Sequence, residues 1–187
     1  MNIFFVKLVG SDLISESEKL GIPVYTVEKF NSSVCSELLK KLSPDLLVIV
    51  SAPILKPAIF EKAKIGCLNA HPGWLPAYRG IGANAWALHA GDSPGISVHF
   101  IDHEIDKGII LDRKKVPFTR KDTAAKINDR AIEMGAEMIC DTIKKIADGQ
   151  CTPPDINEPH GDHYRAMPYK QVKKVNRMIR RGKLHAI

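Results

Sequence analysis

Residues 68–80 read Leu68-Asn69-Ala70-His71-Pro72-Gly73-Trp74-Leu75-Pro76-Ala77-Tyr78-Arg79-Gly80, and a second block further along the chain reads Asp102-His103-Glu104-Ile105-Asp106-Lys107-Gly108. Prolines and glycines interrupt the first block directly after a short apolar run, which predicts that Asn69 and His71 lie where a buried strand ends. Side chains at positions i and i+2 of a strand point to the same face of the sheet. We therefore expect the Asn69 amide and the His71 imidazole side by side, as donors for a carbonyl oxygen.

Strands and helices alternate around this block, a pattern typical of an α/β fold. Continuous apolar runs at residues 2–10 and 45–50 predict strands that are covered on both faces of a parallel sheet, and residues 24–27 predict a further strand. Capping residues and apolar periodicity predict helices at residues 11–20, 32–42, 83–90 and 123–147. The sequence thus indicates a doubly wound, mostly parallel, Rossmann-like sheet whose ligand binds beyond the carboxyl ends of the strands.

A hairpin is expected around the second block. Residues 96–101 alternate between apolar and polar side chains and should pair with residues 109–111. The loop between them would then hold Asp106 rigidly beside His71. His99 lies within the first strand of this hairpin, and we interpret it as structural. The helix at 123–147 is expected to bury an apolar stripe formed by Ile132, Ala136, Ile139, Ile143 and Ile146.

The composition favours one compact domain. The chain has 187 residues, of which 44% are hydrophobic, enough for one core and too few for two domains of ordinary size. We expect this domain to span residues 1–150 and to be followed by an irregular and basic extension over residues 151–187. No apolar run is long enough to cross a bilayer and the amino terminus lacks the pattern of a signal peptide, so we expect a cytoplasmic protein without a membrane partner.

The cysteines indicate a reducing environment. Cys35, Cys67, Cys140 and Cys151 are widely spaced and form no Cys-x-x-Cys motif. Two of them, Cys67 and Cys140, lie in apolar runs, where a free thiol behaves as a small hydrophobic group. Buried, reduced thiols are the preferred interpretation.

Two motifs carry a resemblance to a known family. Asn-x-His-Pro-x-x-Leu-Pro-x-Tyr-Arg-Gly at residues 69–80 is followed by Asp-x-x-x-Asp-x-Gly-x-Ile at residues 102–110. Their order and spacing resemble the 10-formyltetrahydrofolate-dependent formyltransferases, which include glycinamide ribonucleotide, methionyl-tRNA and nucleotide-sugar enzymes. The likeness runs from about residue 13 to residue 149. It implies a transferase of one-carbon metabolism, with residues 1–150 as its catalytic domain and 10-formyltetrahydrofolate as its formyl donor.

The resemblance also assigns roles to residues. It implies catalytic roles for Asn69, His71 and Asp106, and it implies that the backbone of Pro53, Ile54 and Leu55 holds the pterin ring, with Asp102 also on the folate-binding side. A proline-bounded turn would explain residues 53–55 equally well on composition alone. No metal is expected, because His160-x-x-His163 lies in a proline-rich loop without a full set of ligands.

The chemistry follows from the residue types. Formyl transfer to an amine develops negative charge on the formyl oxygen, which fixed donors stabilise. The Asn69 amide supplies a neutral donor, and His71, if protonated, supplies a charged one and can deliver a proton toward the leaving nitrogen. Asp106 would favour the imidazolium form and accept the proton of the attacking amine. In the alternative interpretation, Asn69 and His71 only satisfy backbone groups at a turn and Asp106 caps the hairpin.

The acceptor is less defined. The net charge of +6 and the pI near 9.1 favour an anionic partner, such as a phosphorylated small molecule, a polyglutamylated folate or tRNA. We expect a small phosphorylated or nucleotide-linked amine of the amino-sugar nucleotide or glycinamide ribonucleotide type. The alternatives are a protein similar to methionyl-tRNA formyltransferase, or a catalytically impaired relative that binds folate or RNA.

The two ends of the sequence depart from the family. Compared with its members, the chain is expected to lack one strand-helix unit, with the loop that holds the substrate phosphate in glycinamide-type enzymes, and an unpaired sheet edge would favour a homo-oligomer. Residues 169–183 predict a basic helix or a partly ordered tail. Contact with nucleic acid is one interpretation of that tail, and a solvated basic face is the commoner one.

Overall fold

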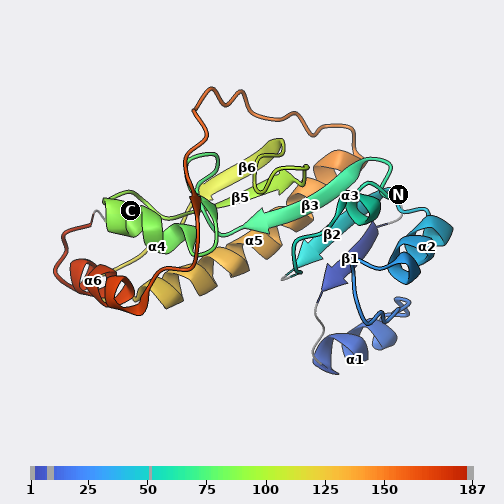
Figure 1. The fold of residues 1–187 in the computed structure, drawn as a ribbon, viewed down its shortest axis with the longest axis horizontal. Coiled ribbons are helices and arrows are strands. Elements are labelled where there is room, and N and C mark those ends of the chain that lie inside the picture. The colour runs from blue at the N-terminus through green and yellow to red at the C-terminus, as the bar shows by residue number, and fades with distance from the viewer. Residues whose placement is uncertain (1–2, 8–10, 51, 185–187) are drawn as a thin grey trace. The chain divides into compact units, whose positions relative to one another are not determined.

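The computed structural model describes residues 3–7, 11–50 and 52–184, and the chain divides into two compact units, Met1–Leu68 and Asn69–Ile187 (Figure 1). Strand β3 (Gly66–His71) crosses this division. The predicted domain boundary after residue 150 stays a prediction. Among the described residues, no helix combines the length and the apolar content that a bilayer crossing requires.

The first unit is built on a parallel strand pair. Strand β1 (Ile3–Lys7) pairs with β2 (Leu46–Val50), with Ile3 opposite Leu46. Both strands were expected, although Asn2 and residues 8–10 of the first predicted strand lie outside the described residues. The first three residues of β2 are fully buried, as expected of a strand covered on both faces.

The helices of this unit follow their sequence signals. They are α1 (Ser11–Lys19), α2 (Ser33–Leu42) and the short α3 (Pro57–Phe60). Ser32 caps α2, because its Oγ accepts a hydrogen bond from Cys35 N at 3.2 Å. The strand predicted at residues 24–27 is wrong: these residues form no regular structure, and Val24 and Tyr25 are exposed. Apolar content alone does not make a strand where no neighbouring backbone pairs with it.

The predicted hairpin of the second unit is confirmed. Strand β5 (Gly95–Phe100) pairs antiparallel with β6 (Ile110–Lys115), with His99 opposite Ile110 and a bulge between Val98 and His99. Strand β6 extends further than residues 109–111. In the sheet, β5 lies between β3 and β6. The loop with Asp106 therefore follows the strand next to the one that ends at His71. Helices alternate along the chain with strands that pair in parallel and antiparallel, which confirms the expected α/β class.

Helix α5 (Ala124–Ala147) packs against β5, on a face that matches the predicted one only in part: Ile139 is buried, as predicted. Ile132 is 48% exposed and Ala136 is exposed, so the predicted stripe is wrong at these positions. The contact is centred on Gly135, where an added Cβ would lie 3.0 Å from side-chain atoms of both Ala70 and Ile96. A glycine that allows close approach is invisible to a search for large apolar residues. The buried residues of the helix are Ala124, Ile127, Ala131, Gly135, Met138, Ile139 and Thr142.

The cysteine prediction is confirmed in part. Cys35 and Cys67 are buried, and burial raises the pKa of Cys67 to about 12. Cys140 is exposed, so its predicted burial is wrong. Its position next to Ile139 on α5 turns it away from the face that packs on the sheet.

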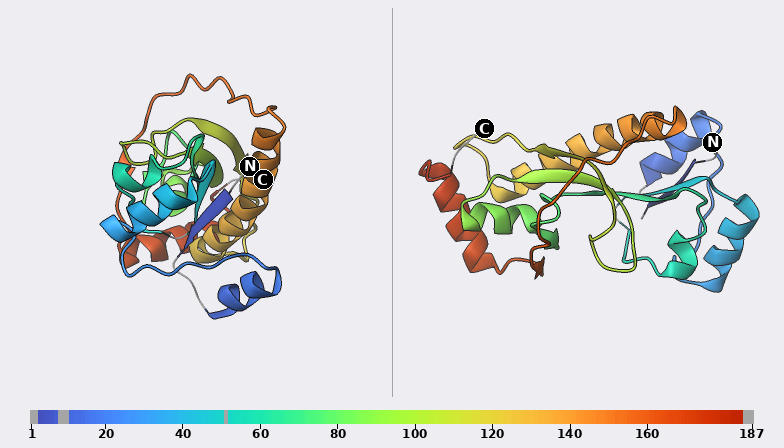
Figure 2. Two further views of the ribbon diagram at one scale, coloured as in Figure 1. Left: turned by 90° about the vertical axis from the view of Figure 1, so that its right-hand side faces the viewer. Right: turned by 90° about the horizontal axis from the view of Figure 1, so that it is seen from above.

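Residues 151–184 run over the second unit. After α5 the chain is extended and returns along this unit to β7 (His163–Tyr164), which pairs in parallel with β4 (Arg79–Gly80) (Figures 1 and 2). It then forms α6 (Tyr169–Arg180), which confirms the expected basic helix. Helix α6 packs against α5 and against α4 (Ala83–Ala90). The helix predicted at residues 83–90 is thus confirmed as α4.

Candidate active site

His71 lies at the end of β3 and is 5% exposed. Its Nε2 lies 3.0 Å from the carbonyl oxygen of Tyr78. Because a carbonyl oxygen only accepts hydrogen bonds, Nε2 carries the proton of this contact. Gly73 closes the turn against the ring, since a Cβ there would lie 2.5 Å from Nε2. The ring is thus fixed, and its Nδ1 faces Asp106.

The carboxylate of Asp106 lies close to two histidines, His71 and His99. Its Oδ2 accepts a hydrogen bond from Gly80 N at 2.7 Å and lies 3.5 Å from His71 Nδ1, and its Oδ1 lies 3.8 Å from His99 Nε2. The side chain is 12% exposed. Its backbone has a φ of 55°, a left-handed conformation that aspartate tolerates better than most residues. The hydrogen bond from β4 stabilises this arrangement.

Asn69 is oriented by His99. The Nδ1 of His99 lies 2.8 Å from the carbonyl oxygen of Phe100 and therefore carries a proton. In the neutral ring, Nε2 is then an acceptor, and it lies 3.2 Å from Asn69 Nδ2. One N–H of the amide is used in this contact, which leaves the second N–H for another acceptor.

Burial decides the charge of both histidines. Loss of hydration lowers the pKa of His71, and the neighbouring Asp106 offsets this only partly. Burial, followed by the proximity of His71, lowers the pKa of His99 to about 4. The expectation that Asp106 favours an imidazolium at His71 is therefore outweighed. The 3.5 Å separation agrees, because charge-assisted N–H···O contacts are shorter, at about 2.8 Å.

Arg79 ties the loop with Asp106 to a distant segment. Its Nη1 donates to the carbonyl oxygen of Ile105 at 3.3 Å, while Nε and Nη2 donate to the carbonyl oxygen of Gly161 at 3.1 and 2.8 Å. The other end of the loop needs a glycine, because a Cβ on Gly108 would overlap the carbonyl oxygen of Phe100. The position of Asp106 thus depends on residues on both sides of it.

The turn after His71 is anchored from β5. Ser97 is fully buried, and its Oγ accepts from Leu75 N at 3.0 Å and donates to the carbonyl oxygen of Gly73 at 2.8 Å. Arg113 on β6 donates to the carbonyl oxygen of Leu75 at 2.8 Å. Arg113 also forms two hydrogen bonds with Glu158, at 2.9 and 2.6 Å. Two strands and the segment after α5 therefore hold this turn.

The residues expected to bind the pterin lie in the first unit. Asn31 stabilises their loop, because its Nδ2 donates to the carbonyl oxygen of Ile54 and its Oδ1 accepts from Lys56 N, both at 2.8 Å. Pro53 has no N–H. A ligand at this loop would therefore have the N–H groups of Ile54 and Leu55 and the carbonyls of Pro53 and Leu55.

The structure thus brings Asn69, His71 and Asp106 together in one unit and adds His99 to them. Asp102 lies at the start of the same loop, exposed, with its Oδ1 accepting from His103 N at 2.6 Å. From the sequence, His99 is interpreted as structural. Its position on the strand next to Asn69, at the same end of the sheet, is the signal that could have identified it. Within the described part of the chain, no group of three or more His, Cys, Asp or Glu residues could hold a metal ion.

Comparisons with known sequences agree with the motifs. Residues 9–143 match the family model described as formyl transferase. The methionyl-tRNA formyltransferase of Chlorobium phaeovibrioides is 33% identical over 132 residues, which are 70% of this chain and 41% of that protein. The chain thus spans about two fifths of the length of such curated relatives.

Solved structures share the fold. The phosphoribosylglycinamide formyltransferase of Anaplasma phagocytophilum superposes with a TM-score of 0.69 at 20% identity, covering 87% of this chain and 98% of that one. The formyltransferase PseJ of Anoxybacillus kamchatkensis, in complex with UDP-4,6-dideoxy-4-formamido-L-AltNAc and tetrahydrofolate, superposes with a TM-score of 0.67 at 21% identity. That match covers 93% of this chain and 89% of PseJ.

Proposed function

This chain belongs to the formyl transferase family, and from that premise we propose that it transfers a formyl group from 10-formyltetrahydrofolate to a primary amine. One observation carries the proposal: the carboxylate of Asp106 lies within 4 Å of two buried imidazoles, one of which orients the amide of Asn69. A donor for a carbonyl oxygen and an acceptor for an amine proton therefore lie in one cluster. This set of groups fits a formyl amide and an attacking amine.

Asn69 is the donor to the formyl oxygen. Its amide is held by the contact with His99, so its second N–H keeps a fixed direction without reorganisation during the reaction. Fixed donors of this kind stabilise the negative charge that develops on a carbonyl oxygen, and removing one costs about 10²–10³ in rate. The folate supplies the activated formyl group.

Asp106 and His71 move the proton. The attacking amine must lose a proton as its nitrogen bonds to the formyl carbon, and the Asp106 carboxylate is the acceptor. His71 Nδ1, a lone pair in the neutral ring, lies 3.5 Å from that carboxylate and receives the proton next. From the imidazolium, the proton passes toward the leaving nitrogen. A neutral resting state of His71 suits this role, because the ring must first accept a proton.

The acceptor that we propose is an amine on a nucleotide-linked sugar. The shared fold with PseJ supports this, since that protein was crystallised with a UDP-linked formamido sugar and tetrahydrofolate. A second candidate is methionyl-tRNA, which is favoured by the 33% identity to a methionyl-tRNA formyltransferase.

An acceptor panel tests the proposed function. Wild type is incubated with 10-formyltetrahydrofolate and with a UDP-linked 4-amino sugar, methionyl-tRNA or glycinamide ribonucleotide, and formylated products are identified by mass spectrometry. We expect product with one of these amines, and about 10²–10³-fold less with Asn69→Ala. Absence of product with all three amines, together with absence of folate binding, would contradict the proposal.

A further inference from the structure

The positive charge of this protein is concentrated at one end of the sequence. Residues 163–187 contain eight of the 27 lysines and arginines and none of the 21 acidic residues. The preceding 162 residues, with 19 basic and 21 acidic residues, therefore have a net charge of −2. The net charge of +6 belongs to the segment that forms α6 and its flanks, and not to the cluster around His71.

Helix α6 presents this charge on one face. Val175 and Ile179 are buried, and the Oδ1 of Asn176 accepts a hydrogen bond from Ala124 N at 2.8 Å, which fixes the helix to the start of α5. With 3.6 residues per turn, the opposite face carries only basic residues and Tyr169. The exposed basic residues on and directly after the helix are Lys170, Lys173, Lys174, Arg177, Arg180 and Arg181.

In the part of the chain that the structure describes, no acidic side chain pairs with this face. In residues 3–7, 11–50 and 52–184, none of the six basic side chains forms an ion pair. Elsewhere on the surface, Lys19, Lys64 and Lys107 each contact a carboxylate. Six like charges on a short, rigid helix repel one another, so an anionic partner would stabilise them.

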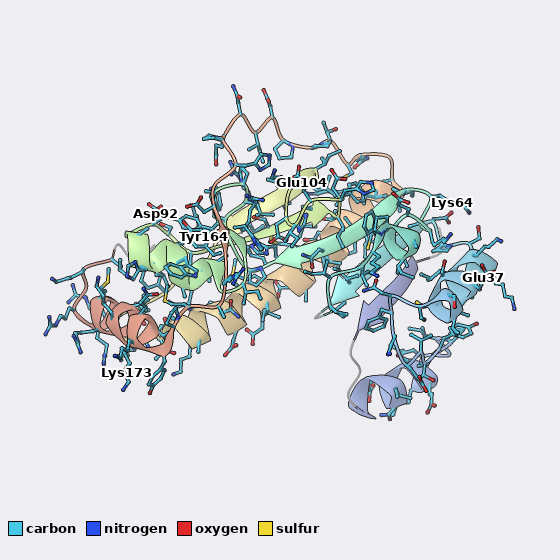
Figure 3. All side chains as sticks on the ribbon, in the orientation of Figure 1. Glu37, Lys64, Asp92, Glu104, Tyr164 and Lys173 are labelled. Atoms are coloured by element: carbon cyan, nitrogen blue, oxygen red, sulfur yellow. The ribbon has the colours of Figure 1, made fainter. Side chains whose placement is uncertain are left out.

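An aromatic ring lies within the basic face. Tyr169 is 71% exposed, and Lys173 Nζ lies 4.6 Å from the centre of its ring. Figure 3 labels Lys173 on this helix. An exposed aromatic ring among basic side chains is the arrangement on which the bases of a single-stranded nucleic acid stack while lysine and arginine contact the phosphates.

A membrane surface fits this helix less well. Interfacial helices insert a free apolar face into the lipid. The apolar face of α6 is already used, because Val175 and Ile179 are buried against the second unit, where α6 contacts α4 and α5. The exposed face offers only Tyr169 for insertion. The charge and the aromatic ring together favour nucleic acid.

We propose that the exposed basic face of α6 binds single-stranded nucleic acid through its phosphates, with Tyr169 as a stacking platform. This surface is separate from the residues of the proposed active site, and the proposal does not rest on the proposed function. Binding is electrostatic and independent of sequence. It therefore weakens steeply with salt, by about 0.7 in log K per log unit of salt for each phosphate contact on a single strand.

Fluorescence anisotropy with labelled oligouridylate and oligothymidylate, across a salt series, tests this proposal. We expect Lys173→Glu/Arg177→Glu to weaken binding about tenfold or more. The slope of log K against the logarithm of salt concentration should become shallower by about 1.4, since two phosphate contacts are lost. Tyr169→Ala should weaken single-strand binding with an unchanged salt dependence. RNA and DNA should bind with similar affinity, because the proposed contacts are to phosphates and base faces. A strong preference for RNA would indicate contacts to the 2′-hydroxyl and would contradict this mode of binding.

The matched control is Lys144→Glu/Lys145→Glu, which makes the same change of charge in the last turn of α5. It should retain binding within about twofold of wild type, since only long-range charge is altered. The neutral variant Lys173→Gln/Arg177→Gln separates loss of contact from repulsion, and circular dichroism verifies the fold of each variant. Three results would overturn the proposal: no binding by wild type at low salt, equal loss in both charge-reversed variants, or tighter binding to anionic vesicles than to oligonucleotides.

Discussion

Oδ2 of Asp106 lies 3.5 Å from Nδ1 of His71, and neither group could hold this position alone. The imidazole is fixed by the carbonyl oxygen of Tyr78, and the carboxylate is fixed by Gly80 N at 2.7 Å. Tyr78 and Gly80 belong to the same short segment, residues 72–80, which begins directly after His71 and ends in β4. One segment of backbone therefore sets the distance between this carboxylate and this imidazole.

Asp106→Asn should lower kcat by about 10²–10⁴, because the amide keeps the hydrogen bond from Gly80 but cannot accept the amine proton. The measurement is the rate of formyl transfer to whichever acceptor the panel identifies. Glu104→Gln, in the same loop with a carboxylate that is 67% exposed, is the control and should retain nearly full activity. Comparable losses in both variants would show that the loop, and not the Asp106 carboxylate, limits the rate.

Arg79→Lys should lower kcat about tenfold and leave the KM for folate within about twofold. The single ammonium nitrogen of lysine lacks the planar fork with which the guanidinium spans the two carbonyl oxygens, so the link between Ile105 and Gly161 is lost. Amide hydrogen exchange should become faster in residues 102–108. Arg165→Lys, which changes an exposed arginine, serves as the control. A parallel change in KM, or unchanged exchange in that loop, would contradict a positioning role for Arg79.

His99→Gln should change how stability depends on pH. The pKa of His99 is about 4 in the folded protein, against 6.5 for an unperturbed histidine, so the unfolded chain binds more protons between these values. The contribution of His99 is fully present above pH 6.5 and falls by roughly 3 kcal/mol as the pH drops to about 4. Urea denaturation between pH 4 and 7.5 should therefore give a flatter profile for the variant. Identical profiles would mean that His99 is not held neutral.

Ser97→Ala should destabilise the protein by about 2–4 kcal/mol, because Leu75 N and the carbonyl oxygen of Gly73 both lose a buried partner. The free energy of unfolding in urea is the measurement. Ser33→Ala, at an exposed position of α2, should change it by about 0.5 kcal/mol or less. A loss at Ser97 no larger than at Ser33 would argue that water replaces the missing hydroxyl.

The features that the sequence predicted correctly are those that short stretches of chain determine, such as helix starts and the hairpin. Capping by Ser32 and Thr123 marked the starts of α2 and α5, and alternation marked the hairpin that brings Asp106 toward His71. These signals depend on residues close together in the chain. The strand predicted at residues 24–27 had a similar local signal, yet it lacks a partner strand, and pairing is decided elsewhere in the fold.

Local patterns could not predict contacts between residues that are far apart in the sequence. His99 contacts Asn69 across 30 residues, and Arg79 contacts Gly161 across 82. Neither pair has a motif of its own, because the register of neighbouring strands and the path of the chain after α5 determine both. The basic helix α6 was expected, but the uniform charge of its exposed face became evident only when the buried side was known.

Calorimetric titration with 5-formyltetrahydrofolate, a stable reduced folate, is the most direct test of whether this chain is a folate-dependent formyltransferase. Wild type and Asp106→Asn should both bind one equivalent, because the substitution removes a proton acceptor and leaves the backbone of residues 53–55 unchanged. With the loss of turnover in Asp106→Asn, this result would separate donor binding from chemistry. Absence of binding by wild type would contradict the proposed function, because the motif around His71 would then have no formyl donor.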